Sequence, residues 1–257
     1  MCLILLAHKP DSLKRLIVAA NRDEFLNRPT ERMHFWHDNP NILAGKDLAA
    51  GGTWLGITRN GRFAALTNYR DPLSQKLDAP SRGKIITDYL EGDLTPVAFL
   101  EKLEKKGSRF NGFNLLVGDK NSLYWFSNIK GEIKKLGHGI YGISNHLLDT
   151  PWPKVNRGKN SLKVILSQKE RITTESLFSM LEEREIPKDN ELPDTGVGME
   201  WEKILAPIFI HSPWYGTRSS TVIIMENSGK TVVCERTFNR GKDMGYSEER
   251  FLFQIQP

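Results

Sequence analysis

Residues 1–24 have the sequence MCLILLAHKPDSLKRLIVAANRDE, in which two short apolar runs stand on either side of a turn-forming segment. The runs cover residues 2–7 and 15–21, and the segment HKPDS at 8–12 contains the proline, aspartate and serine that are common in turns. This pattern predicts a β-hairpin. Because the second strand of a hairpin runs back along the first, we expect the polar residues 21–24 to lie near Cys2.

The composition is that of a globular protein that is not specialised for membranes or nucleic acids. The 257 residues are 39% hydrophobic and 26% charged, which predicts a single domain over residues 1–257 with a substantial core. The longest apolar runs fall far short of the roughly 20 residues of a spanning helix, so no stable membrane insertion is expected. The net charge of +5 comes from scattered basic residues, a pattern that does not favour nucleic-acid binding.

The two cysteines, Cys2 and Cys234, are too few for a disulfide framework. The first residues also lack the long apolar core of a secretory signal. We therefore expect reduced thiols and a cytoplasmic location. Cys234 lies in the apolar run TVVCE, which predicts a buried structural side chain. Nothing in the sequence indicates an oligomeric state.

The segment after the opening hairpin predicts further strands. Residues 53–69, TWLGITRNGRFAALTNY, predict two strands joined at Asn60-Gly61, a dipeptide that favours a type I′ turn. The preceding residues 27–41 are rich in proline, asparagine and histidine and predict a loop. Short strands are also expected in four segments between residues 112 and 145, as a meander, and in the hairpin 217–238 and the run 250–255.

Helices are expected in two groups between the groups of strands. The first group has Ser81 and Thr95 as N-caps and Gly107 as a stop, and the second covers 157–168 and the segment capped by Thr173 or Thr174. The polar segment 186–200 predicts a surface loop. This order differs from the alternation of a parallel sheet and predicts an α+β fold with largely antiparallel sheets. Two strand groups, each covered by a helix pair, would stack as helix, sheet, sheet, helix.

Cys2 becomes chemically useful if Met1 is removed, because one residue then carries a thiol and a free α-amine. The α-amine titrates at about 7.7–8.0 and a thiol at about 8.5, so the amine can accept the proton of its own thiol. Such a pair needs a nearby cation and hydrogen-bond donors for an oxyanion. Arg22 and Asp23 can supply the cation and an acceptor. The alternative is a salt-bridged turn in which Arg22 or Arg28 pairs with Glu24.

Several motifs, taken in order along the chain, resemble the NRDE family, also called the transport-and-Golgi-organisation protein 2 family. These motifs are MCLILLAHKP, AANRDEFLNRP, GGTWLGITRNGRFAALTNYRDP, SRGKIITDYL, FNGFNLLVGD, YGISNHLLDTPWPKV and YGTRSSTVI. The resemblance is weakest over residues 160–210. It implies an N-terminal-nucleophile hydrolase-like fold, a four-layer αββα sandwich. The family is similar, more distantly, to the cysteine amidases of the choloylglycine hydrolase and penicillin V acylase group.

The resemblance to these amidases implies a set of catalytic residues. The matching positions are Cys2, Arg22 with Asp23, Asn68 in LTNYR, Asn145 in GISNH and Arg218 in YGTRSS. The amidases separate their arginine and aspartate by two residues, whereas Arg22 and Asp23 are adjacent, and adjacent side chains of a strand point to opposite faces. Either the strand ends or bulges there, or only one of the two faces Cys2, and Asn21 is an alternative occupant.

Other polar residues are candidates for binding a ligand. These are Asn21, Glu24, Arg70 and Arg82, and each arginine has the alternative of a solvated surface position. Asn68 suits an oxyanion donor or a cap of the following turn, and Arg218 suits an anion site or a bulged strand start. The histidines have no metal-ligand spacing, and His34 and His37 in HFWH predict surface imidazoles, so no metal site is expected.

Two functions are therefore open. The first is a cysteine amidase in which Cys2 attacks an amide and no cofactor is required. The second is a carrier on the same fold, since members of the NRDE family have been linked to haem trafficking and to handling of lipids or acyl-CoA. In both cases the expected partner is a small molecule, apolar with an anionic group, and haem is a candidate ligand.

Overall fold

The computed structural model describes residues 2–168, 172–239 and 245–255, and its strands form two antiparallel sheets. The first, here called the β1 sheet, contains in spatial order β10 (Gly139–Ile143), β1 (Cys2–His8), β2 (Lys14–Phe25), β11 (Tyr215–Glu226), β12 (Lys230–Phe238) and β13 (Tyr246–Gln254). The second, the β6 sheet, contains β3 (Thr30–Phe35), β4 (Ile42–Asp47), β5 (Leu55–Thr58), β6 (Phe63–Asn68), β7 (Phe113–Gly118), β8 (Leu123–Ser127) and β9 (Glu132–Lys135).

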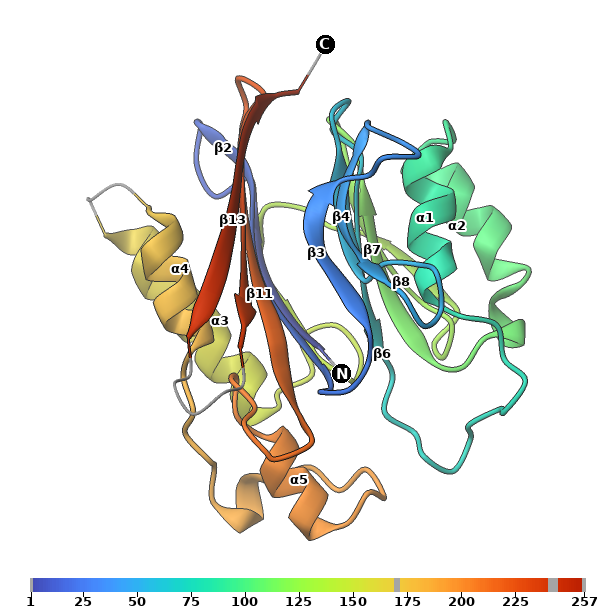
Figure 1. The fold of residues 1–257 in the computed structure, drawn as a ribbon, viewed down its shortest axis with the longest axis vertical. Coiled ribbons are helices and arrows are strands. Elements are labelled where there is room, and N and C mark those ends of the chain that lie inside the picture. The colour runs from blue at the N-terminus through green and yellow to red at the C-terminus, as the bar shows by residue number, and fades with distance from the viewer. Residues whose placement is uncertain (1, 169–171, 240–244, 256–257) are drawn as a thin grey trace.

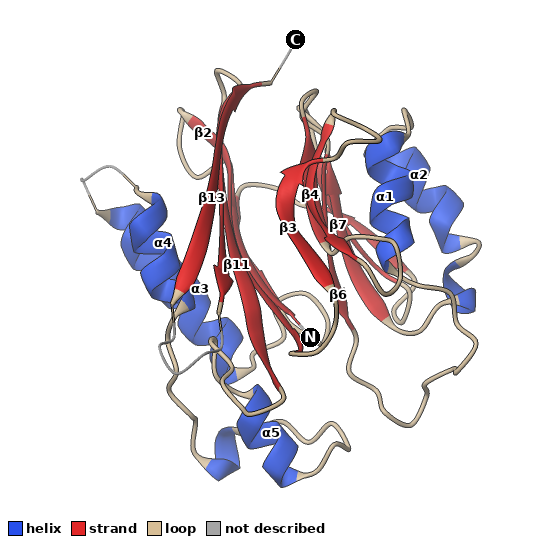
Figure 2. Cartoon of the chain, viewed as in Figure 1, coloured by secondary structure: helices blue, strands red, loops and turns tan. Residues whose placement is uncertain are grey.

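The sheets stack face to face, and a helix pair covers the outer face of each (Figure 1, Figure 2). The pair α1 (Gly83–Glu91) and α2 (Pro96–Glu104) lies on the β6 sheet, and α3 (Pro153–Ser167) and α4 (Thr174–Leu181) lie on the β1 sheet. The short helix α5 (Met199–Leu205) lies at one end of the molecule, and single 3-10 turns occupy Gly107–Arg109 and Asp189–Glu191. The predicted α+β fold with an αββα layer order is confirmed.

Alternation along β1 separates two apolar cores. Ile4 and Leu6 belong to the core between the sheets, whereas Leu3 and Leu5 belong to the core between the β1 sheet and helices α3 and α4. A third core lies between the β6 sheet and helices α1 and α2. Because each strand has a fixed inner and outer face, the register of β1 decides which polar residues reach the space between the sheets.

Several local predictions are confirmed. The opening hairpin forms as β1 and β2, and the strands around Asn60-Gly61 form as β5 and β6. Thr95 and Thr173 cap α2 and α4 by accepting hydrogen bonds from the backbone N–H groups of Ala98 and Ser176. Within the described segments, no helix combines the length and the apolar composition needed to cross a membrane.

The predictions for one turn and one helix cap were wrong. The β5–β6 connection is not type I′, because Gly61 has a positive φ of 85° while Asn60 does not, and the Gly61 N–H closes the turn on the Thr58 carbonyl at 2.9 Å. Ser81 does not cap α1, which begins one residue later than such a cap allows. A Cβ atom at Gly52 would lie 2.4 Å from the Gly83 carbonyl carbon, so close backbone packing sets this helix start instead.

Three segments also differ from their predicted elements. The supposed loop 27–41 contains β3, whose register with β4 shifts between Glu31 and His34 and breaks the alternation that marks a strand. The strand β10 leaves the predicted meander and pairs with β1 in the other sheet. The end of the polar segment 186–200 already belongs to α5, which begins at Met199.

The irregular stretch of β3 is connected to the opposite sheet by a buried carboxylate. The Met33 N–H donates a 2.7 Å hydrogen bond to Glu235 of β12, and the Thr221 hydroxyl donates to the same carboxylate at 3.3 Å. Glu235 is only 1% exposed, and burial raises the pKa of its carboxyl. This side chain therefore links the two sheets through polar contacts inside an otherwise apolar interface.

We predict that Glu235→Gln becomes more stable relative to wild type as pH rises. The raised pKa means that the folded protein holds this proton more tightly than the unfolded chain. The wild type therefore loses stability as pH rises above about 4.3, the ordinary glutamate value, whereas glutamine keeps an acceptor for Met33 without ionising. Urea unfolding of both proteins across this range measures the difference, and a constant difference would contradict the prediction. Glu235→Leu, which removes the acceptor, should be less stable than Glu235→Gln by about 1–3 kcal/mol.

Candidate active site at Cys2

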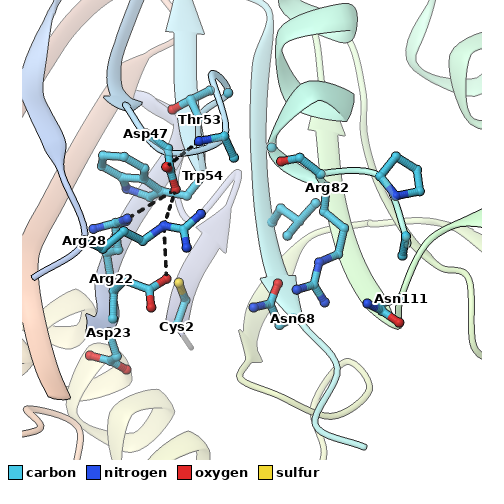
Figure 3. Close-up of a pocket in the computed structure, with 18 residues that line it drawn as sticks. Cys2, Arg22, Asp23, Arg28, Asp47, Thr53, Trp54, Asn68, Arg82 and Asn111 are labelled. Carbon is cyan, nitrogen blue, oxygen red and sulfur yellow. Dashed lines mark hydrogen bonds and ion pairs between the residues drawn. The ribbon is translucent and has the colours of Figure 1, made fainter. Parts of the chain in front are cut away.

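A cavity of about 320 Å³ opens at the end of the space between the two sheets, and Cys2 lies in its wall. The β1 sheet contributes Cys2, Arg22, Asp23 and Glu24. The β6 sheet and its connections contribute Asp47, Trp54 and Asn68, and the start of α1 contributes Arg82. Figure 3 shows Cys2 and Arg22 on one side of this cavity and Asn68, Arg82 and Asn111 on the other.

The register of the opening hairpin places Arg22 directly beside Cys2. The two residues are opposite partners in the β1–β2 ladder, so their side chains share the face that looks toward the β6 sheet. The Arg22 side chain is 5% exposed, and its guanidinium lies 4.3 Å from the centre of the Trp54 ring. Its Nη1 atom is buried without a hydrogen-bond partner among the described residues. Arg22 is thus fixed beside Cys2, and its Nη1 atom can still donate a hydrogen bond to a ligand.

Asp47, at the end of β4 in the β6 sheet, forms ion pairs with Arg22 of β2 and with Arg28, which follows β2. Its Oδ2 atom lies 3.6 Å from Arg22 Nη2 and accepts a 2.7 Å hydrogen bond from Arg28 Nε, while Oδ1 accepts from the N–H groups of Ala49 and Ala50. Arg28 also lies 3.8 Å from the Glu24 carboxylate. Of the pairs in the salt-bridged-turn alternative, only Arg28 with Glu24 is present, while Arg22 pairs across the two sheets.

Asn21 and Asp23 occupy the other face of β2. The Asn21 amide donates to the Leu181 and Ile208 carbonyls, both at 2.9 Å, under the helix layer. Asp23 accepts a 2.7 Å hydrogen bond from the Thr217 hydroxyl, although part of the residue also lines the cavity. The strand is regular through both residues, and the bulge lies in β11 between Thr217 and Ser219. Arg22 therefore shares the face of Cys2, and Asp23 points away from it (Figure 3).

Asn68 faces the cavity at the end of β6, and the segment after β10 holds it in place. The Asn145 amide donates a 2.9 Å hydrogen bond to the Asn68 carbonyl, and the neighbouring Ser144 hydroxyl donates to the Cys2 carbonyl at 3.2 Å. Asn145 is fully buried and is absent from the cavity wall. Ser144 and Asn145 together connect the strand of Cys2 to the strand of Asn68, and Asn145 does not line the site.

Arg82 enters the cavity from the start of α1. Its Nη1 atom donates a 2.9 Å hydrogen bond to the Gly112 carbonyl, and burial lowers the pKa of its guanidinium. The close packing of Gly52 on Gly83 brings this end of α1 against the turn after β4. Arg82 therefore adds a cation to the wall opposite Cys2.

Arg70 and Arg218 lie outside the cavity wall. Arg70 forms a buried 2.6 Å ion pair with Glu202 of α5. Arg218 sits at the β11 bulge and donates from Nη1 to the carbonyls of Phe25 and Arg28, at 2.9 and 3.0 Å. The position of Arg218 at the bulge matches the bulged-strand alternative predicted from the sequence. Both arginines make structural contacts outside the cavity.

Burial raises the pKa of the Cys2 thiol above its usual value. The charge of Asp23 adds to this rise, whereas Arg22 and a hydrogen bond from the Asp23 backbone oppose it. The thiol is thus mainly protonated at neutral pH and needs a proton acceptor to act as a nucleophile. Met1, whose removal would supply that acceptor, lies outside the described residues.

Lys154 is a buried cation behind Cys2 that the sequence analysis missed. It stands in the first turn of α3, is 2% exposed, and donates from Nζ to the Leu205 carbonyl at 2.8 Å. Burial lowers the pKa of this amine to about 8, while Asp23 and Cys2 partly oppose the change. A lysine in the first turn opposes the helix dipole. The helix begins at Pro153, earlier than the expected 157, so the sequence analysis did not place Lys154 in that turn.

Asp47, Trp54 and Asn111 were also missed, because their roles depend on contacts between distant segments. Cys234 is fully buried, as predicted. Among the residues that the structure describes, no group of three or more histidine, cysteine or acidic side chains is placed to hold a metal ion.

Comparisons with known proteins agree with the motifs found in the sequence. A family model described as Transport and Golgi organisation 2 matches residues 1–240. The Transport and Golgi organization 2 homolog of Mus musculus is 35% identical over 276 residues and aligns over 100% of both chains. Transport and Golgi organization protein 2 of Drosophila melanogaster is 27% identical over 244 residues, which cover 87% of this chain and 86% of that protein.

A comparison with solved structures identifies the fold. The mutant C2A conjugated bile acid hydrolase from Clostridium perfringens has a TM-score of 0.52 and 10% sequence identity, and the alignment covers 100% of this chain and 97% of that chain. This likeness shows that the fold is of the N-terminal-nucleophile hydrolase type. The motif resemblance is confirmed as well, and the chain belongs to the Transport and Golgi organisation 2 family.

Proposed function

We propose that this protein is a cysteine amidohydrolase that cleaves an amide C–N bond with the thiol of Cys2 after removal of Met1. One observation carries the proposal: Cys2 lies in register with Arg22 and faces Asn68 across a cavity large enough for a small molecule. A nucleophile, a cation and an amide donor then converge on one space, as acyl transfer requires.

The reaction begins when the α-amine of Cys2 takes the thiol proton and the sulfur attacks the amide carbon. A C–S bond forms, and the carbonyl oxygen becomes an oxyanion that the Asn68 amide stabilises by donating a hydrogen bond. The C–N bond then breaks, and the ammonium of Cys2 returns the proton to the leaving nitrogen. Water hydrolyses the thioester, which restores the thiol and releases the carboxylic acid.

The remaining groups position these atoms. Arg22 favours the thiolate by its charge, and its unpaired Nη1 atom can donate to a polar group of the substrate beside the thiol. Asn145 keeps Asn68 at the cavity by holding its carbonyl. The charge of Asp23 reaches Cys2 from the other face of β2, so this carboxylate can orient the α-amine of the same residue. Arg82 supplies a second cation. No cofactor takes part in these steps.

The cavity suits a small molecule that has an apolar part and an anionic group. Trp54, Leu66 and Pro80 supply apolar surface, and Arg22 and Arg82 supply cations on opposite walls. We place this reaction in the cytoplasm, where the free thiols of Cys2 and Cys234 stay reduced.

A carrier of acyl-CoA, lipid or haem is the second candidate function. The raised pKa of Cys2 favours it, because a neutral thiol is a poor nucleophile until it loses its proton. The arginines would bind phosphates or propionates, and Cys2 is the one haem ligand in the described cavity lining. Under this function, palmitoyl-CoA or haemin binds saturably, Arg22→Met weakens binding, and no hydrolysis occurs. Titration followed by fluorescence measures this, and lack of saturable binding would contradict it.

We expect hydrolysis of N-acylated amino acids to depend on Cys2 and Asn68. Cys2→Ala should abolish activity, and Asn68→Ala should lower kcat by about 10²–10³-fold, the usual effect of removing an oxyanion donor. Cys234→Ala serves as the matched control, since this cysteine is buried among apolar side chains away from the cavity. Release of free amino acid over a panel of acyl chains measures the rates. Full activity in Cys2→Ala would refute the mechanism.

Substitutions on the two faces of β2 should shift the titration of Cys2 in opposite directions. Arg22→Met should raise the pKa of the thiol further, because the arginine charge favours the thiolate, and Asp23→Asn should lower it. The pH dependence of iodoacetamide labelling at Cys2 reports the midpoint. Cys2→Ser gives the background from Cys234. Equal midpoints in all variants would show that neither charge acts on the thiol.

A further inference from the structure

A second cavity adjoins the Cys2 cavity and has a volume of about 270 Å³. It lies between the 71–82 loop, which connects β6 to α1, and the segment around Phe110. Arg82 and Asn111 line both cavities, and the consecutive residues Asn68 and Tyr69 line the first and the second in turn. The two cavities are therefore neighbours that share one partition.

Paired polar contacts hold the wall of this second cavity. Asn111 accepts a 2.7 Å hydrogen bond from the Lys76 N–H and donates to the Lys76 carbonyl at 3.0 Å. The Lys76 ammonium also donates to the Ser108 carbonyl. Both polar atoms of Asn111 thus bind the backbone of the 71–82 loop, and the loop is fixed against the body of the protein beside the partition.

The lining of the second cavity combines cations with apolar surface. Lys76 and Arg82 are its basic residues. The acidic residue Asp71 already accepts a hydrogen bond from the Ser74 N–H at 3.2 Å. Phe110 and Ile129 supply apolar surface, and Ile129 is 48% exposed. This chemistry fits a short apolar chain that ends in an anionic group.

We propose that the substrate of Cys2 extends past Arg82 into the second cavity, which binds an anionic arm on the leaving-group side of the scissile amide. This inference rests on the proposed function, because it assigns a part of the substrate to a place beside the reacting thiol. Arg82 lines both cavities, so its guanidinium can contact the arm as it leaves the first one. Figure 3 shows the Arg82 side chain between Asn68 and Asn111 on the wall opposite Cys2. The protein then selects N-acyl compounds whose amine part carries a carboxylate or phosphate on a short chain.

The test uses Cys2-directed chloroacetamides, whose carbon forms a thioether with the thiolate as chloride leaves. One probe is N-chloroacetyl-6-aminohexanoic acid, the second is its neutral methyl ester, and the third is chloroacetamide itself. Intact mass and peptide mapping measure the labelling rate of Cys2. We expect the acid to react roughly tenfold faster than the ester, the effect of one charge-assisted hydrogen bond.

Variants assign this preference to the second cavity. Arg82→Met should bring the acid-to-ester ratio close to one, and taking a ratio corrects for any change in thiol reactivity. Ser74→Trp should fill the second cavity and slow both long probes relative to chloroacetamide. The matched control is Leu77→Trp on the same loop, where the side chain is 100% exposed and outside the lining, and its ratios should equal those of wild type.

The outcomes separate this inference from the proposed function. Equal rates for acid and ester in the wild type, with no effect of Ser74→Trp, would overturn the second subsite while leaving Cys2 as a nucleophile. A failure of all three probes to label Cys2 would overturn the proposed function, and this inference with it. A preference for the acid that survives in Arg82→Met and Ser74→Trp would place the anionic arm elsewhere and also overturn the inference.

Discussion

The pairing of Cys2 with Arg22 in the antiparallel β1–β2 ladder is the constraint on which the site depends. A shift of one residue would turn Arg22 toward the helices and bring Asn21 or Asp23 to the inner face, because side chains alternate along a strand. The apolar residues of both strands fix the register. Val18 and Ala20 belong to the core between the sheets, whereas Ile17 and Ala19 belong to the core under the helices. The burial of these apolar residues therefore also places the Arg22 side chain beside the Cys2 thiol.

Contacts between the sheets then give this hairpin its chemical surroundings. Asp47 and Trp54 approach Arg22 from the β6 sheet, and the Ser144 and Asn145 side chains connect the start of β1 to the end of β6. Asp23 and Lys154 carry buried charges on the far side of the β1 sheet. Cys2 thus lies between two sets of charged groups, and burial keeps its thiol largely protonated until a base acts on it.

The parts of this arrangement that could be predicted from the sequence are those set by neighbouring residues. The opening hairpin, the strands around Gly61 and the Thr95 and Thr173 caps all depend on local patterns. The adjacency of Arg22 and Asp23 left two alternatives, a strand that ends or bulges there or a single residue facing Cys2, and the regular strand in the structure corresponds to the second. Asp47, Lys154 and the carboxylate of Glu235 depend on contacts between distant segments, which periodicity does not reveal. Arg70 and Arg218 resembled site residues by position, but their donors bind Glu202 and backbone carbonyls.

The claim that Cys2 is an N-terminal nucleophile is tested most directly by trapping its acyl intermediate. The protein purified from cells is mixed with a p-nitrophenyl acyl ester, quenched in acid, and analysed by intact mass and peptide mapping. We predict a chain without Met1 that carries one acyl group on Cys2. A chain that keeps Met1, or acylation absent from Cys2, would contradict this account.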